Sequence, residues 1–165
     1  DVNSIIGIDA SVAMCARARQ RRTTAITNVL QRDAAATGLP SCSADVVLCG
    51  FGVKTLGRTQ LDAVVLEAGR VLRRGRRLVI AEMSVPAIAI TRRVYLGGLH
   101  HLGPLVASML GADPDPHRAL AGYVTAFGDG RHLTPVFLRH GLRVREWRAM
   151  NFGCALLVVA EKVGD

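Results

Sequence analysis

Aromatic residues and lysine are both scarce in this chain. Aromatic side chains make up 4% of its 165 residues, and Lys54 and Lys162 are its only lysines. Such a composition lacks the stacking platforms that bind single-stranded nucleic acid, so no nucleic-acid partner is expected. The net charge of +8 is carried by arginine. It indicates either a high-GC genome or a basic surface for an acidic substrate, an anionic membrane or nucleic acid.

Several motifs that would define a function class are also missing. The four cysteines form no C-x-x-C pair, which predicts reduced, buried thiols in a cytoplasmic protein: Cys15, Cys42, Cys49 and Cys154. The five histidines lack a metal-ligand spacing, so no metal site is expected. There is no G-x-S-x-G or Walker-type loop, no secretory signal and no run of eighteen apolar residues, so no membrane span is expected.

The clearest pattern present is a strand, a helix and a second strand within residues 45–86. Val46 to Cys49 and Leu78 to Met83 are short apolar runs bounded by glycine and proline. Between them, apolar residues recur at spacings of three and four from Leu61 to Leu72, which predicts one helical face. This length is typical of a parallel β-α-β unit whose strands are buried on both faces.

Ligands of such sheets bind beyond the carboxyl ends of the strands, which are here residues 49–51 and 82–84. An earlier strand, Ser4 to Ile8, closes at Asp9, and a helix is predicted from Ser11 as its N-cap. A carboxylate at this position can accept hydrogen bonds from the two hydroxyls of a ribose, or it can simply cap the helix. The residues alone leave both alternatives open.

The remaining segments complete an α/β order. A weak strand is predicted over Ala25 to Gln31. After Pro86, helices are predicted over residues 91–110, 116–127 and 133–140, followed by an antiparallel strand pair at 142–150 and 154–162. We expect one domain with three parts: a nucleotide-binding part at 1–90, a helical insertion at 91–140 and a terminal strand pair at 141–165.

Three sequence words carry a family resemblance. They are D-x-V-x-x-x-F-G from Asp45, R-V-L-x-x-G-x-R-L from Arg70 and E-x-S-x-P from Glu82. Together with H-G-L-x-V and F-G-x-A-L near the end, they resemble the UbiE-type C-methyltransferases of ubiquinone and menaquinone biosynthesis. These are class I enzymes that depend on S-adenosyl-L-methionine (SAM). The resemblance implies an α/β, Rossmann-like class I methyltransferase sheet, mostly parallel with an antiparallel last strand, and with a helical insertion.

The same resemblance implies the cofactor residues. SAM, or the product S-adenosyl-L-homocysteine, would be held at its ribose by Asp9, with Met14 near the adenine. Asp33 and Ala34 match a short family pair whose side chain reaches the adenine amino group. Gly50 and Phe51 form the corner beside them. The alternative for Asp33, as a single aspartate in a loop, is a turn residue that faces solvent and binds nothing.

The helical insertion resembles the family's substrate-covering helices. It implies a hydrophobic small-molecule acceptor, quinone-like or polyketide-like, with His101 as the base that removes a phenolic proton and Tyr95 and Tyr123 as pocket hydroxyls. The alternatives are a helical layer that only packs on the sheet and a histidine that caps a carbonyl. A methyltransferase-like protein without methyl transfer, acting as a cyclase-type pocket protein or a subunit, is the alternative function. A homodimer and peripheral membrane contact are further expectations.

Two departures from the family pattern concern the site. Lys54 and Thr55 stand where the family has arginine and asparagine. Lys54 keeps the positive charge of the arginine but cannot make two parallel hydrogen bonds as a guanidinium does, and Thr55 lacks the side-chain amide of the asparagine. Residues 117–120 replace a tyrosine-rich word, so the substrate end differs more than the cofactor end.

The largest departure is an omission. A family member would have, before Ser4, a first strand and a G-x-G-x-G loop that holds the amino-acid end of SAM. That strand would lie between the strands ending at Asp9 and Cys49. Three resolutions are open: the sequence is a fragment, the neighbouring strands close up, or a partner chain supplies the strand.

Overall fold

The strands form two separate sheets. The computed structural model describes residues 4–21, 26–111 and 113–164. In the smaller sheet β1 (Ile5–Asp9) pairs in parallel with β2 (Ile26–Gln31). The larger sheet has the order β3-β4-β6-β5, with bounds β3 Ala44–Gly50, β4 Leu72–Met83, β5 Leu142–Met150 and β6 Ala155–Lys162. Helix α1 (Val12–Gln20) connects β1 to β2 and packs on them.

The β-α-β unit is confirmed. Helix α2 (Arg58–Val71) joins β3 to β4, which pair in parallel, and buries Leu61, Val65 and Ala68. These side chains pack against Leu72 and Ile80 of β4, which are almost fully buried. The period of three and four therefore marked the core face of the helix.

The antiparallel end of the sheet is also confirmed. β4 pairs antiparallel with β6, and β6 pairs antiparallel with β5. β6 alternates buried and half-buried residues, as a strand inside a covered sheet does. Helix α6 (Leu133–Arg139) covers this end and buries Leu133 and Phe137 completely.

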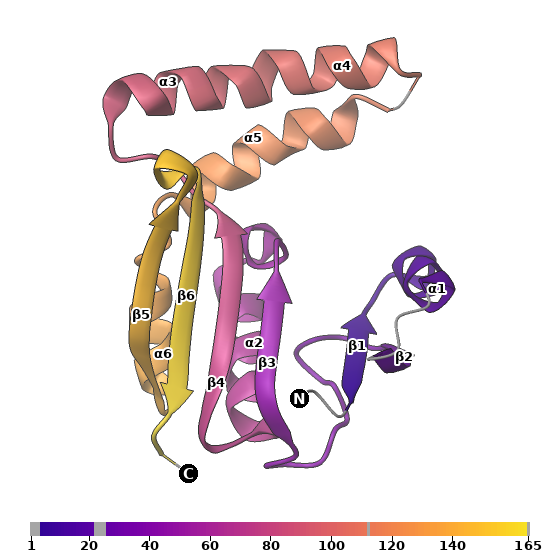
Figure 1. The fold of residues 1–165 in the computed structure, drawn as a ribbon, viewed down its shortest axis with the longest axis vertical. Helices are drawn as coiled ribbons and strands as arrows, with labels where there is room; N and C mark the ends of the chain where they lie inside the picture. Colours follow the sequence, from indigo (N-terminus) through magenta and orange to yellow (C-terminus); the bar gives the residue numbers. More distant parts are fainter. Residues whose placement is uncertain (1–3, 22–25, 112, 165) are drawn as a thin grey trace.

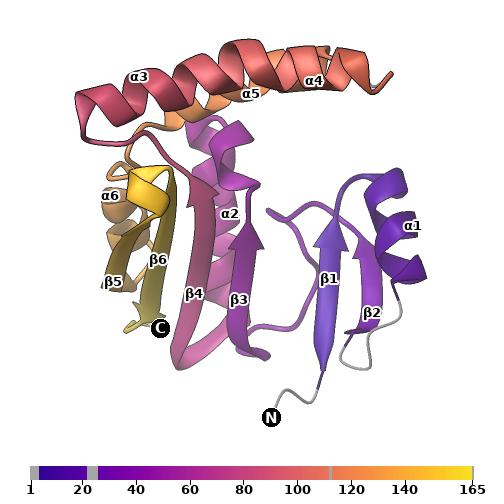
Figure 2. The same cartoon turned by 45° about the horizontal axis from the view of Figure 1, so that its top comes forward.

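A helical layer lies across the carboxyl edge of the larger sheet (Figures 1 and 2). It consists of α3 (Ala89–Gly97), a π-helical segment (Gly98–Leu102), α4 (Gly103–Met109) and α5 (Asp115–Phe127). The glycines in this stretch do not end the helix: Gly97 is in α3, Gly98 is in the π-helical segment and Gly103 is in α4. The 3-10 turns Val53–Thr55 and Asn151–Gly153 lie below this layer.

Two details of β4 differ from the sequence-based expectation. The strand begins at Leu72, six residues earlier than predicted, and residues 73–76 form a large bulge. The register moves from Ala44↔Leu72 to Val46↔Arg77 across it. The backbone needs a positive φ to make this bulge, and Gly75 supplies it at +74°.

The expectation that β3 is buried on both faces is wrong. Val46 is 59% exposed and Leu48 is 70% exposed. Among the residues that the structure describes, β3 pairs with β4 alone, so no strand is paired with its other edge. β1 lies on that side and points the same way, as Figure 2 shows, but belongs to the other sheet. The neighbouring strands therefore do not close up.

The cysteines and helices give two further results. All four cysteines are free; Cys15 is buried, but Cys42 is exposed, so the expectation of buried thiols is wrong for Cys42. Cys49 and Cys154 are half-buried. Within residues 4–21, 26–111 and 113–164, no helix has the length and apolar character needed to cross a bilayer.

Candidate functional site

Three strand ends lie at one edge of the molecule. Asp9 ends β1 beside Gln31 of β2, and the amide of Arg32 donates a 3.1 Å hydrogen bond to the carbonyl of Asp9. Asp33 therefore directly follows a residue bonded to Asp9. Gly50 ends β3, which points in the same direction as β1 (Figure 2). The structure thus brings Asp9, Asp33 and Gly50 to the same edge, where the sequence-based hypothesis places a nucleoside.

The carboxylates of Asp9 and Asp33 each accept a hydrogen bond through one oxygen from the amide two residues later in the chain. Asp9 Oδ1 accepts a 2.8 Å hydrogen bond from the amide of Ser11, and Asp33 Oδ1 accepts one of 2.8 Å from the amide of Ala35. The N-cap of α1 is Ser11, whose Oγ accepts from the amide of Met14 at 3.3 Å. Within the described ranges, Oδ2 of both aspartates receives no hydrogen bond, and both residues are exposed. These oxygens can accept hydrogen bonds from hydroxyl or amino groups.

Three further predicted cofactor residues, Gly50, Ala34 and Met14, are open to solvent. A Cβ atom on Gly50 would meet no described atom within 4 Å, so the backbone can be approached closely there. Ala34 is exposed, and Met14 on α1 is 48% exposed. The side of the edge that faces away from the core is therefore free of bulky neighbours.

The corner at Phe51 is held by a buried ion pair. Phe51 has a φ of +59°, which a residue with a Cβ rarely adopts, and its amide donates to the carbonyl of Ala81 at 2.8 Å. Its carbonyl accepts a hydrogen bond from Lys54 Nζ, which lies 3.0 Å from Glu82 Oε1. The side chains of Lys54 and Glu82 are 6% and 0% exposed, whereas Phe51 is 59% exposed.

This pair is the site feature that sequence reasoning missed. Glu82 was placed at the ligand edge, and Lys54 was noted as a departure from the family pattern. Their partnership joins residues 28 positions apart. The signal that could have found it is the apolar surroundings of both residues in the sequence, because a buried charge needs a partner.

The two predicted catalytic residues have different surroundings. Tyr95 is half-buried, and its hydroxyl donates a 3.2 Å hydrogen bond to the carbonyl of Cys154. Burial raises the pKa of Tyr95 to about 12, so its hydroxyl keeps its proton at neutral pH. His101 lies in the π-helical segment and is exposed. Its ring is 5.8 Å from that of His100, and no hydrogen bond joins it to a described residue.

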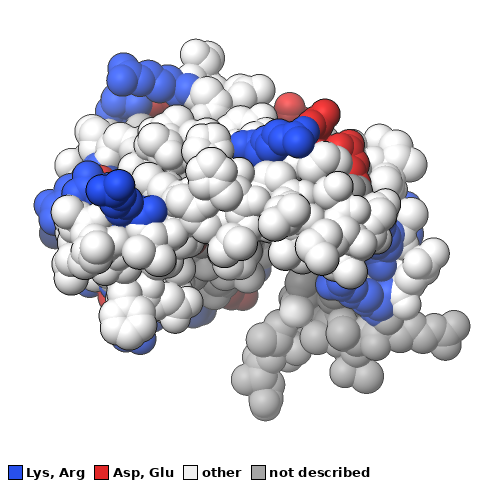
Figure 3. All heavy atoms as spheres, turned by 90° about the horizontal axis from the view of Figure 1, so that it is seen from above, with Lys and Arg blue, Asp and Glu red and all other residues white. Residues whose placement is uncertain are grey.

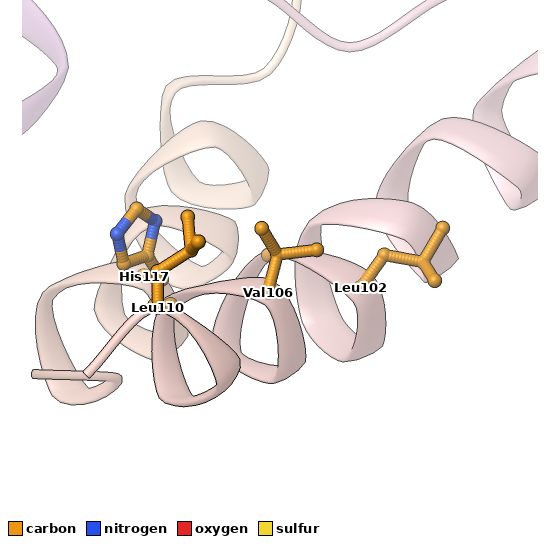
Figure 4. A pocket seen from close by; sticks show the side chains of 6 residues that line it. Leu102, Val106, Leu110 and His117 are labelled. Atoms are coloured by element: carbon orange, nitrogen blue, oxygen red, sulfur yellow. The ribbon is translucent and has the colours of Figure 1, made fainter. Parts of the chain in front are cut away.

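Two apolar hollows open in the helical layer. The α4–α5 hollow, shown in Figure 4, is lined by Leu102, Gly103, Val106, Ala107, Leu110 and His117. The α3 hollow is lined by Ile90, Thr91, Val94, Tyr95, Phe152 and Cys154. His101 and Tyr123 line neither, while His117, which sequence reasoning did not place in a pocket, contributes the imidazole of the first.

The upper surface of this layer is mostly uncharged. In Figure 3, white side chains cover most of it, and basic side chains form separate groups. Its exposed apolar residues include Ile90, Val94, Met109 and Leu110, of which the last two are 78% and 79% exposed.

The fold is that of the class I SAM-dependent methyltransferases. A SAM-dependent methyltransferase structure from Methanosarcina mazei superposes with a TM-score of 0.62 at 12% identity, covering 98% of this chain and 83% of that one. A SAM-dependent methyltransferase from Aquifex aeolicus superposes with a TM-score of 0.63 at 16% identity, covering 97% and 69%. At these identities the likeness shows the fold.

The chain belongs to the ubiE/COQ5 methyltransferase family, whose model matches residues 2–162. A demethylmenaquinone methyltransferase from Mycolicibacterium paratuberculosis is 31% identical over 159 residues, which are 95% of this chain and 66% of the relative. One from Corynebacterium kroppenstedtii is 27% identical over 158 residues, covering 96% and 66%. The chain thus spans just under two thirds of the length of these relatives.

Proposed function

We propose that this chain takes part in SAM-dependent methyl transfer to a hydrophobic, quinone-like small molecule. The observation that supports this most directly is the meeting of Asp9, Asp33 and Gly50 at one strand-end edge, in a chain of the ubiE/COQ5 family. The printed name of the relatives, demethylmenaquinone methyltransferase, supports the substrate class. The alternative of a pocket protein without methyl transfer has no support from these relatives.

The hydrogen-bond acceptors at the edge fit the nucleoside end of SAM. Asp9 and Asp33 each have one carboxylate oxygen that takes no hydrogen bond from the described part of the chain. The ribose hydroxyls would donate to Asp9 and the adenine amino group to Asp33. Gly50 leaves room for close approach of the nucleoside, because nothing fills the place of its missing side chain.

The amino-acid end of SAM has no matching group in residues 4–21, 26–111 and 113–164. Among the described residues, the G-x-G at the ligand edge is Gly50-Phe51-Gly52, which follows β3 and whose Phe51 carbonyl accepts a hydrogen bond from Lys54. SAM supplies an electrophilic methyl group on its sulfonium. The protein's own work is to align the acceptor with it and to exclude water.

The helical layer would hold the acceptor. Because Tyr95 keeps its proton, its role is to donate a hydrogen bond, and His101 remains the proposed base. The α4–α5 hollow is apolar, and His117 contributes an imidazole to its lining. In this proposal residues 1–90 bind the cofactor, 91–140 cover the acceptor and 141–165 complete the sheet.

Contact with a membrane surface is a further part of the proposal. The exposed apolar residues Val94, Met109 and Leu110 lie in one helical layer with the exposed Arg92 and Arg93. Apolar side chains beside arginines suit an anionic bilayer surface. Flotation with phosphatidylglycerol vesicles tests this: the chain should float with them and stay behind with phosphatidylcholine vesicles.

The experiment for the nucleoside site is calorimetric titration with adenosine, which needs no amino-acid end. We expect Asp9→Asn and Asp33→Asn to weaken binding about ten-fold each, because each removes one charge-assisted hydrogen bond. Asp129→Asn is the matched control. Asp129 Oδ1 also holds a turn, by accepting from the amide of Arg131 at 3.0 Å, and it lies after α5.

Equal effects of all three substitutions would refute the nucleoside site. Methyl transfer is tested separately, with SAM labelled in its methyl group and a demethylated naphthoquinol as acceptor. Retention of nucleoside binding with no methyl transfer would refute the proposed reaction while leaving the cofactor site intact.

A further inference from the structure

Two carbonyls at the carboxyl end of helix α2 bring a cysteine and a lysine together. The carbonyl of Arg70 accepts a 3.0 Å hydrogen bond from the amide of Cys42, in the loop before β3. The carbonyl of Leu72 accepts one of 3.0 Å from Lys162 Nζ, at the end of β6. The last carbonyls of a helix have no partner within the helix, so groups from other segments satisfy them. As a result, Lys162 Nζ lies 3.9 Å from Cys42 Sγ, although the two residues are 120 positions apart.

The amine of Lys162 is buried without a carboxylate beside it. Lys162 is 7% exposed, and within residues 4–21, 26–111 and 113–164 its ammonium group contacts only the Leu72 carbonyl and the Cys42 sulfur as polar partners. The other lysine of the chain, Lys54, has a side chain that is 6% exposed, but it is paired with Glu82 at 3.0 Å. A buried amine normally has such a partner. The thiol of Cys42 is the titratable group that stands in this place for Lys162.

Cys42 is the accessible member of the pair. It is exposed, whereas Cys15 is buried and Cys49 and Cys154 are half-buried. Its backbone has a φ of +52° and is tied to α2 through its own amide, so the Cα atom is fixed beside the lysine. A small oxidant can therefore reach the sulfur from solvent, while the amine approaches it from the core.

We infer that Cys42 and Lys162 form an oxidative modification site, at which hydrogen peroxide converts the thiol and the amine into a covalent sulfur–nitrogen crosslink. First, the Cys42 sulfur attacks one peroxide oxygen: an S–O bond forms, the O–O bond breaks, and the other oxygen leaves as water. The sulfur loses two electrons and the peroxide gains them. The Lys162 nitrogen, after giving its ammonium proton to solvent, then attacks the sulfenic sulfur. An S–N bond forms, the S–O bond breaks, and hydroxide leaves as water with a second proton from the nitrogen.

This site lies at the opposite end of the larger sheet from the ligand edge. β4 starts at Leu72 and reaches the ligand edge at Met83, and the antiparallel β6 ends at Lys162 (Figure 1). The crosslink would join the loop before β3 to the last strand. A covalent link between residues so far apart in the chain restricts the unfolded state and so stabilises the folded one. The inference goes beyond the proposed function, because it involves no group that contacts the nucleoside.

Mass spectrometry of the oxidised protein tests this inference. The full 165-residue chain is treated with hydrogen peroxide, and its intact mass is measured before the remaining thiols are alkylated and the chain is digested with trypsin. We expect a monomer that is lighter by two hydrogen atoms, a peptide pair joined through Cys42 and Lys162, and no cleavage after Lys162. A thiol reductant should reverse all three. In urea, the equilibrium constant for unfolding should fall about ten-fold or more on crosslinking.

Cys42→Ser is the test variant and Cys154→Ser its control. Each replaces a thiol that is not fully buried by a hydroxyl of similar size, so both variants should fold. The tryptic peptide that carries Lys162 also carries Cys154, so the control separates the sulfur–nitrogen crosslink from a disulfide. We expect the product to vanish in Cys42→Ser and to persist in Cys154→Ser. Lys162→Arg keeps a cation without a nucleophilic amine, and its Cys42 should stop at the sulfenic acid, which dimedone traps.

Several results would overturn the inference. Sulfenic acid at Cys42 of the native chain without any crosslinked peptide would show that the amine does not react. A product that survives in Cys42→Ser, or that is lost in Cys154→Ser, would identify other sulfur chemistry. A crosslink mapped to Lys54 in the native chain would exclude Lys162 whether or not the variants fold. All of these measurements are independent of SAM binding and methyl transfer.

Discussion

Lys54 Nζ lies 3.0 Å from Glu82 Oε1, and the two side chains are 6% and 0% exposed. Glu82 Oε2 also accepts from the amide of Lys54 at 3.1 Å, and Oε1 accepts from the amide of Met83 at 2.7 Å. The same ammonium group donates to the carbonyl of Phe51. One buried pair therefore connects the end of β4 to the corner after β3, at the ligand edge.

Breaking this pair from one side should destabilise the protein strongly. Lys54→Met leaves the Glu82 carboxylate buried without a cation, and we expect a loss of about 3–5 kcal/mol in the free energy of unfolding. Lys54→Met combined with Glu82→Gln removes both charges and should recover much of that loss. Urea denaturation followed by circular dichroism measures it. A single variant no less stable than the double variant would contradict the pairing.

Glu67 connects the loop before β3 to helix α2 and should make stability depend on acid. Its carboxylate accepts from Arg70 Nε at 2.7 Å and from the amide of Thr37 at 2.9 Å. The hydrogen bond from Arg70 is the main reason why the pKa of Glu67 falls to about 2. A lowered pKa contributes stability that is present above the unfolded value, near 4.5, and is lost as the pH falls toward 2.

Unfolding experiments between pH 6 and pH 2 test this. We expect Glu67→Gln to be less stable than the native chain at pH 6 and to approach it at pH 2. Glu146→Gln is the control, since Glu146 pairs with Arg148 at the surface, where both side chains are more than 40% exposed. Parallel pH curves for the native chain and Glu67→Gln would exclude this role.

The elements with local signals were predictable from the sequence. Ser11 as N-cap, the buried face of α2 and the antiparallel pair β5–β6 follow from residue type and spacing. The bulge at Gly75 was not predictable from the sequence, because the apolar Leu72 is equally consistent with the end of a helix and with the start of a strand. Helix propensity did not distinguish an α-helix from the π-helix at Gly98–Leu102, a five-residue segment in which no residue is buried.

Long-range relationships account for the rest. The continuous apolar run from Val46 to Cys49 predicts burial, but burial requires neighbours, and the described chain supplies β4 on one side only. Likewise, the edge that joins Asp9, Asp33 and Gly50 was predicted from strand order, whereas the Lys54–Glu82 pair needed the three-dimensional fold.

Tyr95 should act as a hydrogen-bond donor and not as a base. Because burial raises its pKa to about 12, the protonated form is favoured in the folded state. This contributes stability that is present below pH 10 and is lost as the pH rises toward 12. Spectrophotometric titration at 295 nm should show a tyrosinate signal near pH 12 that is absent in Tyr95→Phe. Appearance of the Tyr95 signal at a lower pH, nearer the ordinary tyrosine value of about 10, would mean that the hydroxyl is solvated.

The two apolar hollows differ in their suitability for a methyl acceptor. α4 and the start of α5 extend toward the side of the fold where β1 lies, as Figures 1 and 2 both show, whereas the α3 hollow lies beside the turn between β5 and β6. A methyl donor held at Asp9 and Gly50 is on the first side. We therefore expect the acceptor to bind in the α4–α5 hollow, next to His117.

A pair of lysine substitutions separates the hollows. Val106 lines the α4–α5 hollow and is 50% exposed, and Val94 lines the α3 hollow and is 69% exposed, so both sites tolerate a longer side chain without unfolding. In equilibrium dialysis with a short-chain naphthoquinone, Val106→Lys should weaken binding about ten-fold, because the charge would have to be desolvated against an apolar ring. Val94→Lys should change it less than about two-fold. The reverse order would place the acceptor at Tyr95 and make its hydroxyl, which donates to Cys154, the group nearest the ring.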